Sequence, residues 1–507
     1  MAEAPFTLEA AVAGRLWIQD TIHCPRALPP LSSAVWCAIM ADGALGMDSK
    51  TFNGFVFMSP RGMPGTAPGH TEPLEGTVRW RWEQRYLPKV RAAYESLRRR
   101  DYASATAEEL VSVFEDELGP VCRAFNLTLG SAVELGPDAD RLSDFLEKRL
   151  GAEGGLLAAT ILHGADTETA SLGRDVRRLA DAAEQTANAK AMLAAGDFEG
   201  MRDSGDEPWH AELARFLGEH ADEIALWSEL HEPPWSEDPL PLMRLVRATV
   251  GAARRSSSQA SARAEEEVRT RLNPEDIAEF EAAISLSRDY VPVIEDRARW
   301  QLKLMGALRL PLAALGKRLA ESGVFADPGD VFFLEVEELA PVAAGTFDAL
   351  ALVAERRRQW ERNVALEAPQ TLGLPISWEM VGSFSSMARR MFGAAAIQAP
   401  TATVVSGIGA SGGVATGRAR VVRSLDEAEG LEDGDILVCP STSPPWTPYL
   451  AIVSALVTNS GGVLCHAAIE AREYGIPAVV GTLRATELIV DGATVTVDGT
   501  AGTITIL

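Results

Sequence analysis

The amino-acid sequence predicts a multidomain protein, with a large, mainly α-helical domain over residues 1–395 and a small α/β domain over residues 396–507. Three observations support this fold class. The chain has 507 residues, more than a single hydrophobic core usually organises. Its composition is that of a globular protein, with 47% hydrophobic and 23% charged residues. The spacing of apolar residues changes from helical to strand-like near residue 396.

The large domain begins irregularly and continues as helices. Residues 1–79 are rich in proline and glycine, and only the stretch GFVFM has the composition of a strand. From about Trp80 to Met391 the apolar residues recur at helical spacing, as in RARWQLKLMGALRLPLAALGKRLAES. We therefore expect a large helical domain over this range.

The small domain alternates short strands with two helices. The expected strands are TATVVSG, GRARVVRS, GDILVCP, ALVTNS, AVVG, ATVTVDG and TITIL. One helix is expected over PPWTPYLAIVSA. The other, over CHAAIEAREYG, opens after Gly461 and Gly462 and ends at Gly475, with Pro477 just beyond.

Charge and composition exclude several classes of function. A formal net charge of -24 opposes binding to nucleic-acid phosphates. No apolar run is long enough to span a bilayer, and MAEAPFTLEA is not a secretion signal, so we expect a soluble, cytoplasmic protein without membrane contact. The 5 cysteines form no CxxC pair, which favours reduced thiols. The histidines show no ligand spacing such as HExxH, so no metal site is expected.

The most informative residue is His466, which is expected at the N-terminus of a helix after a double glycine. The positive end of the helix dipole favours an anion there and keeps an imidazole neutral and nucleophilic. Gly461 and Gly462 leave room for another surface to approach. A histidine that accepts a phosphoryl group needs these properties, although a histidine that only caps or packs at a helix start is the alternative.

The string TNSGGVLCHAAIEAREYGIPAVVG resembles the phosphohistidine signature of a swivelling domain. Pyruvate phosphate dikinase, phosphoenolpyruvate synthase, rifampicin phosphotransferase and phenylphosphate synthase share this domain. The resemblance extends from SGGVATGRARVV to the last strand and covers residues 405–507. It implies that His466 carries the phosphoryl group and that four residues hold the phosphate: Thr458, Gly461, Gly462 and Arg472. The family usually has Ser before the histidine and an acidic residue after the threonine, where this chain has Cys465 and Asn459.

Two other motifs compete in the same region. Gly407, Gly409 and Gly412 spell GxGxxG, but a dinucleotide site needs a helix next, and GVATGRARVV has the pattern of a strand. A GxSxG motif around Ser411 precedes Asp435 and His466 in the order of an α/β hydrolase. Its nucleophile elbow also needs a helix, so a Ser411/Asp435/His466 hydrolase is the weaker alternative.

The N-terminal segment, WIQDTIHCP followed by LPPL, resembles the opening of the substrate domain in phenylphosphate synthase and rifampicin phosphotransferase relatives. Residues 323–339 and the stretch FLGEHADEIALWSELHEPPWSEDPLPLM resemble other parts of that domain. This implies that residues 1–395 bind the acceptor. His23, with Asp20 three residues earlier, is the candidate general base for the acceptor hydroxyl. A polar loop histidine bonded to backbone is the alternative.

Other candidate substrate-binding residues lie on expected helices or beside the N-terminal segment. Glu295 or Asp296 could face the interior of the helical domain, although a solvated face is the default. Trp17 and Trp36 could line an aromatic pocket, although core packing is the default.

These observations together predict the substrate-binding and phosphohistidine subunit of an ATP-dependent phosphotransferase, resembling phenylphosphate or methylphenylphosphate synthase. No Walker A sequence occurs and the helical pattern leaves no room for an ATP-grasp domain, so ATP and Mg²⁺ are expected on a partner ATP-grasp subunit. The chain ends at Leu507, directly after the small domain, which argues against pyruvate. The expected acceptor is a small organic hydroxyl, a phenol or cresol. A non-catalytic phosphocarrier or regulatory protein is the competing class.

Overall fold

The structure, a computed structural model, describes residues 14–21, 23–41, 47–61, 76–162, 168–203, 207–223, 229–250, 258–366, 368–369, 371–374, 403–463 and 465–507. The domain boundary expected near residue 396 lies outside these residues. The helices of the large region are α2 Pro30–Ala41, α3 Val78–Arg81, the π-helix η1 Trp82–Tyr86, α4 Leu87–Arg98, α5 Ala107–Leu150, α6 Ala152–Ile161, α7 Glu168–Gln185, α8 Ala187–Ala195, α9 Phe198–Asp203, α10 Glu207–His220, α11 Leu240–Thr249, α12 Ser258–Arg271, the 3₁₀ helix η2 Pro274–Asp276, α13 Ile277–Glu321, the 3₁₀ helices η3 Pro328–Phe333 and η4 Val336–Glu338, α14 Leu339–Ala343 and α15 Leu350–Val364.

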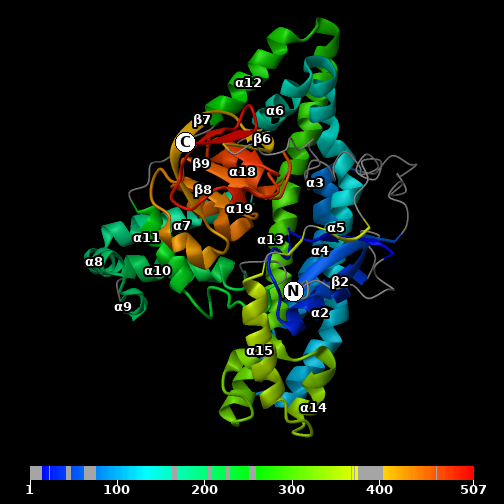
Figure 1. Ribbon diagram of the computed structural model, residues 1–507, viewed down its shortest axis with the longest axis vertical. Helices are drawn as coiled ribbons and strands as arrows, with labels where there is room; N and C mark the ends of the chain where they lie inside the picture. The colour runs from blue at the N-terminus through cyan, green and yellow to red at the C-terminus, as the bar shows by residue number, and fades with distance from the viewer. Residues whose placement is uncertain are drawn as a thin grey trace.

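Two long helices, α5 and α13, run side by side along the length of the molecule (Figure 1). With 45 residues, α13 is about 67 Å long at the usual rise per residue. Phe114 and Phe125 of α5 and Leu304 and Leu308 of α13 belong to one buried cluster. This cluster is the main core of the helical region, as the helical spacing of the sequence predicts.

A small antiparallel sheet covers one side of the long helices. Its strands are β1 Leu16–Gln19, β2 Met47–Phe52, β3 Phe55–Pro60 and β4 Thr371–Gly373, in the order β2-β3-β1-β4. Asn53 and Gly54 have φ of 51° and 79°, which matches the two-residue turn of a tight hairpin between β2 and β3. The strand expected at GFVFM is confirmed as β3. The helical pattern drawn through residue 391 was wrong at β4, because these residues pair with β1 across most of the chain.

The C-terminal domain is an 8-stranded sheet of order β5-β12-β11-β7-β8-β9-β10-β6. The strands are β5 Val404–Ser406, β6 Ile408–Ser411, β7 Val414–Val421, β8 Ile436–Cys439, β9 Ala455–Thr458, β10 Ala478–Val480, β11 Thr494–Asp498 and β12 Thr503–Ile506. Neighbouring strands β7, β8, β9 and β10 run parallel. The crossovers between them contain the 3₁₀ helices η5 Leu425–Gly430 and η6 Pro444–Ala451, and then α18 His466–Glu473; the short helix α19 Ala485–Leu488 follows β10.

Two expectations for this domain have different outcomes. The helix expected over PPWTPYLAIVSA is the 3₁₀ helix η6, because its prolines lack the N–H groups that an α-helical ladder needs. The stretch after the GxGxxG glycines is the strand β7, as predicted, so no helix follows them to bind a dinucleotide.

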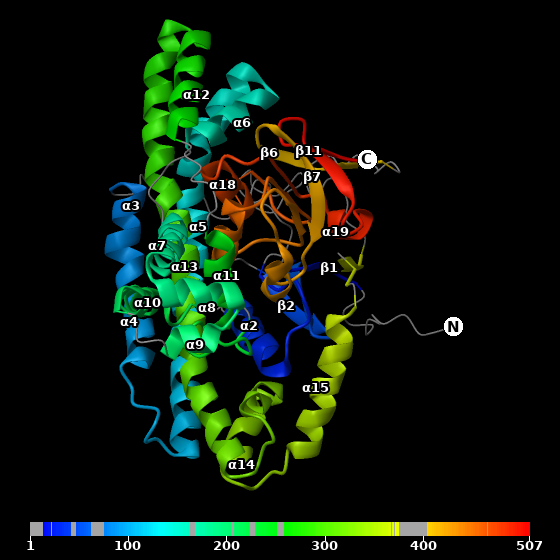
Figure 2. The ribbon, with the colours of Figure 1, turned by 90° about the vertical axis from the view of Figure 1, so that its left-hand side faces the viewer.

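The C-terminal domain shares a hydrophobic core with the helices α7, α8, α10 and α11. Leu172 and Phe216 of these helices belong to the same buried cluster as Trp446, Leu450 and Ala471 of the C-terminal domain. Figure 2 shows this domain above the N-terminal sheet, on one side of the long helices. Ile469 of α18 belongs instead to the main core of the long helices, so the C-terminal domain packs against two separate parts of the helical region.

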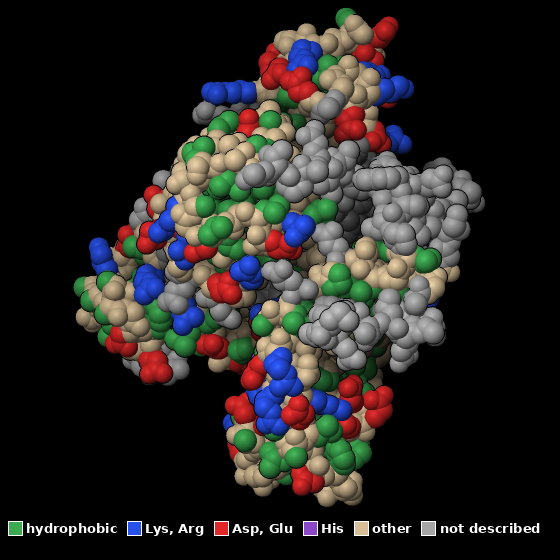
Figure 3. Space-filling view, in the orientation of Figure 1, with side chains coloured by type: hydrophobic (Ala, Val, Ile, Leu, Met, Phe, Trp, Pro, Cys, Tyr) green, Lys and Arg blue, Asp and Glu red, His purple; other side chains and the backbone are tan. Residues whose placement is uncertain are grey.

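The surface carries mixed charge. In Figure 3, acidic and basic side chains lie next to each other over α15, where Arg358 and Arg362 both pair with Glu355. Among the described residues, no helix combines the length and apolar character needed to cross a membrane.

Candidate active site

His466 is the first residue of α18, as the sequence predicts. The loop between β9 and α18 needs glycine at position 461, where φ is 108° and a Cβ atom would lie 2.6 Å from the Cys465 sulfur. Cys465 is the N-cap residue, but its side chain makes no cap hydrogen bond. The unpaired N–H groups at the start of α18 are therefore not capped by this side chain.

The imidazole of His466 lies at the contact between the two regions of the chain. Its Nδ1 is 3.3 Å from Oε2 of Glu295 on α13, and its Nε2 is 3.3 Å from Oγ1 of Thr447 on η6. The side chain of His466 is only 8% exposed, and that of Glu295 only 1%. A carboxylate beside Nδ1 favours the tautomer with the proton on Nδ1, which leaves the lone pair on Nε2. The geometry thus makes Nε2 the nucleophilic nitrogen.

Glu295 therefore faces the interior, and the solvated position taken as the default was wrong for this residue. The neighbouring Asp296 points elsewhere and accepts a hydrogen bond from the indole N–H of Trp82. Of the two candidate carboxylates, Glu295 is the one that contacts His466.

Glu470, which is not among the residues predicted from the sequence, lies one helical turn after His466. It is fully buried, and neither of its carboxylate oxygens has a hydrogen-bond partner. Burial and the nearby charge of Glu295 raise the pKa of Glu470 well above its ordinary value. Residues four apart on a helix lie on the same face, so the spacing of His466 and Glu470 could have indicated that their side chains are neighbours.

Two predicted phosphate-binding side chains bond to backbone in this structure. Thr458 donates its hydroxyl to the Ser460 carbonyl at 2.7 Å. Arg472 donates to the carbonyls of Ala410 and Val463 at 2.6 and 2.8 Å, and burial lowers its pKa to about 10. These bonds shape the loop before His466. Phosphate binding by Thr458 and Arg472 remains a prediction.

His23 and Asp20 form a pair in the N-terminal loop. Nδ1 of His23 lies 3.0 and 3.1 Å from the two carboxylate oxygens of Asp20, which also accepts the His23 backbone N–H at 3.0 Å. Asp20 is only 2% exposed. The pair repeats the arrangement at His466, since Nδ1 again faces a carboxylate and Nε2 is again the basic nitrogen.

A hydrogen bond joins the loops that carry the two histidines. Ser460, between β9 and α18, donates to Oγ1 of Thr21 at 2.7 Å. Thr21 lies between Asp20 and His23 in the sequence. The structure thus brings the N-terminal segment that holds Asp20 and His23 against the loop that precedes His466.

Trp17 and Trp36 are both core residues. Trp17 is 1% exposed and packs edge to face on Phe52, and Trp36 is 0% exposed and packs on Phe125 and on the ring of His23. Core packing, the default expectation, holds for both residues. A role in acceptor binding remains a prediction.

The hydrolase alternative gains no support. Ser411 lies at the end of β6 and is followed by another strand, so there is no nucleophile elbow. Asp435 pairs with Arg418 at 2.8 and 3.0 Å, whereas His466 contacts Glu295 and Thr447. These three residues do not form a triad.

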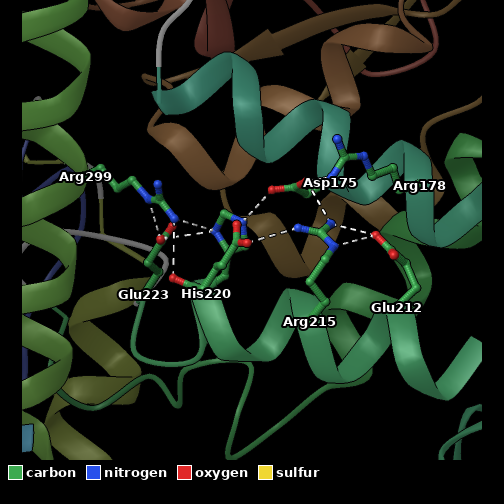
Figure 4. A network of polar contacts seen from close by, with 8 residues as sticks. Asp175, Arg178, Glu212, Arg215, His220, Glu223 and Arg299 are labelled. Carbon is green, nitrogen blue, oxygen red and sulfur yellow. Dashed lines mark hydrogen bonds and ion pairs between the residues drawn. The ribbon is translucent and has the colours of Figure 1, made fainter.

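A second buried polar network holds α10 and α7 against α13 (Figure 4). Nδ1 of His220 lies 3.1 Å from Glu223, and its Nε2 lies 3.1 Å from Asp175. Arg299 of α13 donates to Glu223 at 2.7 Å. Burial raises the pKa of Glu223, but the charge of Arg299 and the hydrogen bond to His220 outweigh burial. Together they lower the pKa of Glu223 to about 2. Because Glu295 and Arg299 are one turn apart, the same stretch of α13 contacts α18 and α10.

Two family models match the parts of the chain that meet at His466. Residues 431–502 match the mobile domain of PEP-utilising enzymes, and residues 132–295 match the fourth domain of rifampicin phosphotransferase. Residues 431–502 thus form a mobile domain of the PEP-utilising enzyme type. His466 lies inside the first match, and Glu295 is the last residue of the second.

Curated relatives agree with this assignment. Rifampicin phosphotransferase of Streptomyces sviceus is 30% identical over 81% of this chain and 48% of its own length. The uncharacterized phosphotransferase YvkC of Bacillus subtilis is 41% identical over 39% of this chain and 24% of its own length. Chondramide synthase cmdD of Chondromyces crocatus is 27% identical over 98% of this chain but 14% of its own length. The chain thus spans less than half of the length of each of these relatives.

Proposed function

We propose that this protein is the acceptor-binding and phosphohistidine component of an ATP-dependent phosphotransferase. The observation that carries the proposal is the position of His466, at the start of α18 with Nδ1 against Glu295 of the helical region. In that position a phosphoryl group on His466 would already lie beside the part of the chain that holds the acceptor. The match of relatives named phosphotransferases supports this reaction class.

In the first half-reaction, Nε2 of His466 attacks a phosphoryl group of ATP. An N–P bond forms, and the bond from phosphorus to the leaving oxygen breaks. Glu295 keeps the proton on Nδ1 and stabilises the positive charge that the ring gains when Nε2 is phosphorylated. ATP and Mg²⁺ would be held by a separate ATP-grasp subunit.

In the second half-reaction, the acceptor hydroxyl attacks phosphorus in line with Nε2 of His466. The N–P bond breaks, and its electron pair returns to the ring. Nε2 of His23 takes the hydroxyl proton, with Asp20 holding the opposite side of its ring. The bond between Ser460 and Thr21 supports this role, since it places the two loops together.

A phenol is the acceptor that suits this base best. Its proton has a pKa near 10, so a neutral imidazole removes it more easily than the proton of an alcohol. Trp17 and Trp36 do not strengthen this choice, because both are buried in the core. Rifampicin is the second candidate, since the name of the relative that matches 81% of this chain states that substrate.

The test is phosphorylation of the chain by an ATP-grasp partner with radiolabelled ATP and magnesium, analysed at alkaline pH because phosphohistidine is acid-labile. We expect label on His466 and its transfer to phenol or cresol. A His466→Ala chain that still transferred phosphate at the normal rate would refute the assignment. Label that stays on His466 with every hydroxyl compound would instead favour a phosphocarrier or regulatory protein.

The nucleotide is tested separately by calorimetric titration of the chain alone with ATP and magnesium. We expect no tight binding, since the sequence has no phosphate-binding nucleotide motif outside the His466 loop. Micromolar binding at one site would reveal a nucleotide domain in this chain and end the two-subunit proposal.

A further inference from the structure

Three side chains that can bind a metal converge at the contact between α13 and α18. Glu295, His466 and Glu470 each offer one ligand atom, and these atoms lie within 4.8 Å of one another. Glu295 belongs to α13, whereas the other two belong to α18. His466 and Glu295 are 171 positions apart in the sequence, so a local sequence motif such as HExxH could not reveal the cluster.

Glu470 provides an independent observation that points to a ligand at this site. Its side chain is 0% exposed, and both of its oxygens lack a hydrogen-bond partner. A buried carboxylate needs a proton, a hydrogen-bond donor or a cation. The nearest candidate donors in the cluster are unsuitable, because Nδ1 of His466 is directed at Glu295, and Glu295 is itself an acid. A cation placed among the three side chains would satisfy Glu470.

We propose that Glu295, His466 and Glu470 bind one divalent transition-metal ion. One imidazole nitrogen and two carboxylate oxygens form a donor set that suits Mn²⁺ or Zn²⁺ better than Ca²⁺. Such ligands lie about 2.0–2.2 Å from the metal, so ligand atoms that lie up to 4.8 Å apart must move closer together when the ion binds. The sequence alone predicts no metal site, and the cluster departs from that expectation because its members come from distant segments.

The ion would occupy the place of the proton on Nδ1 of His466. Nε2, which faces Thr447, would stay available to carry a phosphoryl group. Because the ligands come from two regions of the chain, the ion would also fasten α18 to α13. The proposal shares His466 with the proposed function, but metal binding needs no phosphoryl transfer, so each can fail without the other.

The experiment is a titration of the purified full-length chain, freed of metal with a chelator, with Mn²⁺ alone. Free Mn²⁺ is followed by its electron paramagnetic resonance signal, which weakens on binding. We expect one Mn²⁺ per chain. Glu470→Gln and Glu295→Gln should each weaken binding by about tenfold or more, since loss of even an outer partner of a metal ligand commonly has that effect. Circular dichroism checks that each variant folds.

A matched control comes from the second cluster of possible ligands, Asp175, Glu219 and His220. Glu219 is exposed, and Glu219→Gln should leave Mn²⁺ binding unchanged. Binding that is lost in Glu219→Gln but kept in Glu470→Gln would overturn the proposal. So would the absence of Mn²⁺ binding at millimolar concentration, which would mean that a proton alone satisfies Glu470. If Glu470→Gln does not fold, Glu295→Gln and His466→Gln decide the question in the same assay.

Discussion

The hydroxyl of Ser460 donates a 2.7 Å hydrogen bond to the hydroxyl of Thr21, across 439 positions of sequence. It joins the loop that precedes His466 to the loop that holds Asp20 and His23. In the proposed reaction, these loops carry the donor of the phosphoryl group and the base for its acceptor.

Removing this bond should affect the second half-reaction and spare the first. We expect Ser460→Ala to slow transfer from phosphorylated His466 to phenol several-fold, since one hydrogen bond contributes about 1 kcal/mol. Single-turnover measurements with the phosphorylated chain would show it. Ser454→Ala is the control, because the bonds of Ser454 stay within the C-terminal domain. Equal slowing of both half-reactions would contradict the expectation.

His23→Ala should slow transfer to phenol by about a hundredfold or more, the usual effect of losing a general base, and should leave phosphorylation of His466 intact. Asp20→Asn should also slow transfer, because an amide no longer selects the tautomer with the proton on Nδ1. His210→Gln is the control, since His210 lies on α10 and its ring contacts the Met201 carbonyl. A normal rate in His23→Ala would exclude His23 as the base.

Folding stability should depend on pH through His220. Burial lowers the pKa of His220, but the bonds to Asp175 and Glu223 outweigh burial and raise it above the ordinary value. The stabilisation is therefore complete below the unfolded pKa of about 6.5 and is lost as the pH rises through the folded pKa; it amounts to about 1.4 kcal/mol for each pH unit that separates the two pKa values. Urea unfolding should show lower stability at alkaline than at slightly acidic pH. His220→Gln should flatten this dependence and His210→Gln should not; an unchanged slope in His220→Gln would contradict the assignment.

Gly306 is required for close packing between α13 and the residues after α10. A Cβ atom there would lie 1.7 Å from the backbone oxygen of Asp222, so Gly306→Ala must move one of the two segments. We expect a loss of about 1–3 kcal/mol in the free energy of unfolding. Gly218→Ala on α10 is the matched control, since a Cβ there meets nothing within 4 Å and should stabilise the helix by about 0.5–1 kcal/mol. Equal effects of the two variants would argue against this packing.

The sequence predicts those parts of the fold that depend on neighbouring residues. The helix that begins at His466 follows from its glycines and apolar spacing, and the strand β3 from its composition. The strand β4 was missed because only pairing with β1 makes it a strand. Glu295 was a candidate, but its burial depends on α18 lying against α13, and Glu470 became significant only once that contact was known. Contacts between distant segments were thus the part that local patterns could not supply.

If the C-terminal domain moves between two sites, it must separate from some of the helices that it contacts. The core that it shares with the helices α7 to α11 determines which contacts break. Separation along this core would expose the apolar surfaces of Trp446 and Leu450 to water, at about 25 cal/mol for each Å². Along α13 the contacts of Glu295 and Arg299 are polar, and polar groups recover their hydrogen bonds in water. The favoured parting line therefore follows α13, and Leu230, between α10 and α11, and Ile469 of α18 are apolar residues that would have to leave the main core. The helices α7 to α11 would then move together with the C-terminal domain that carries His466. The moving unit would be larger than the mobile domain alone.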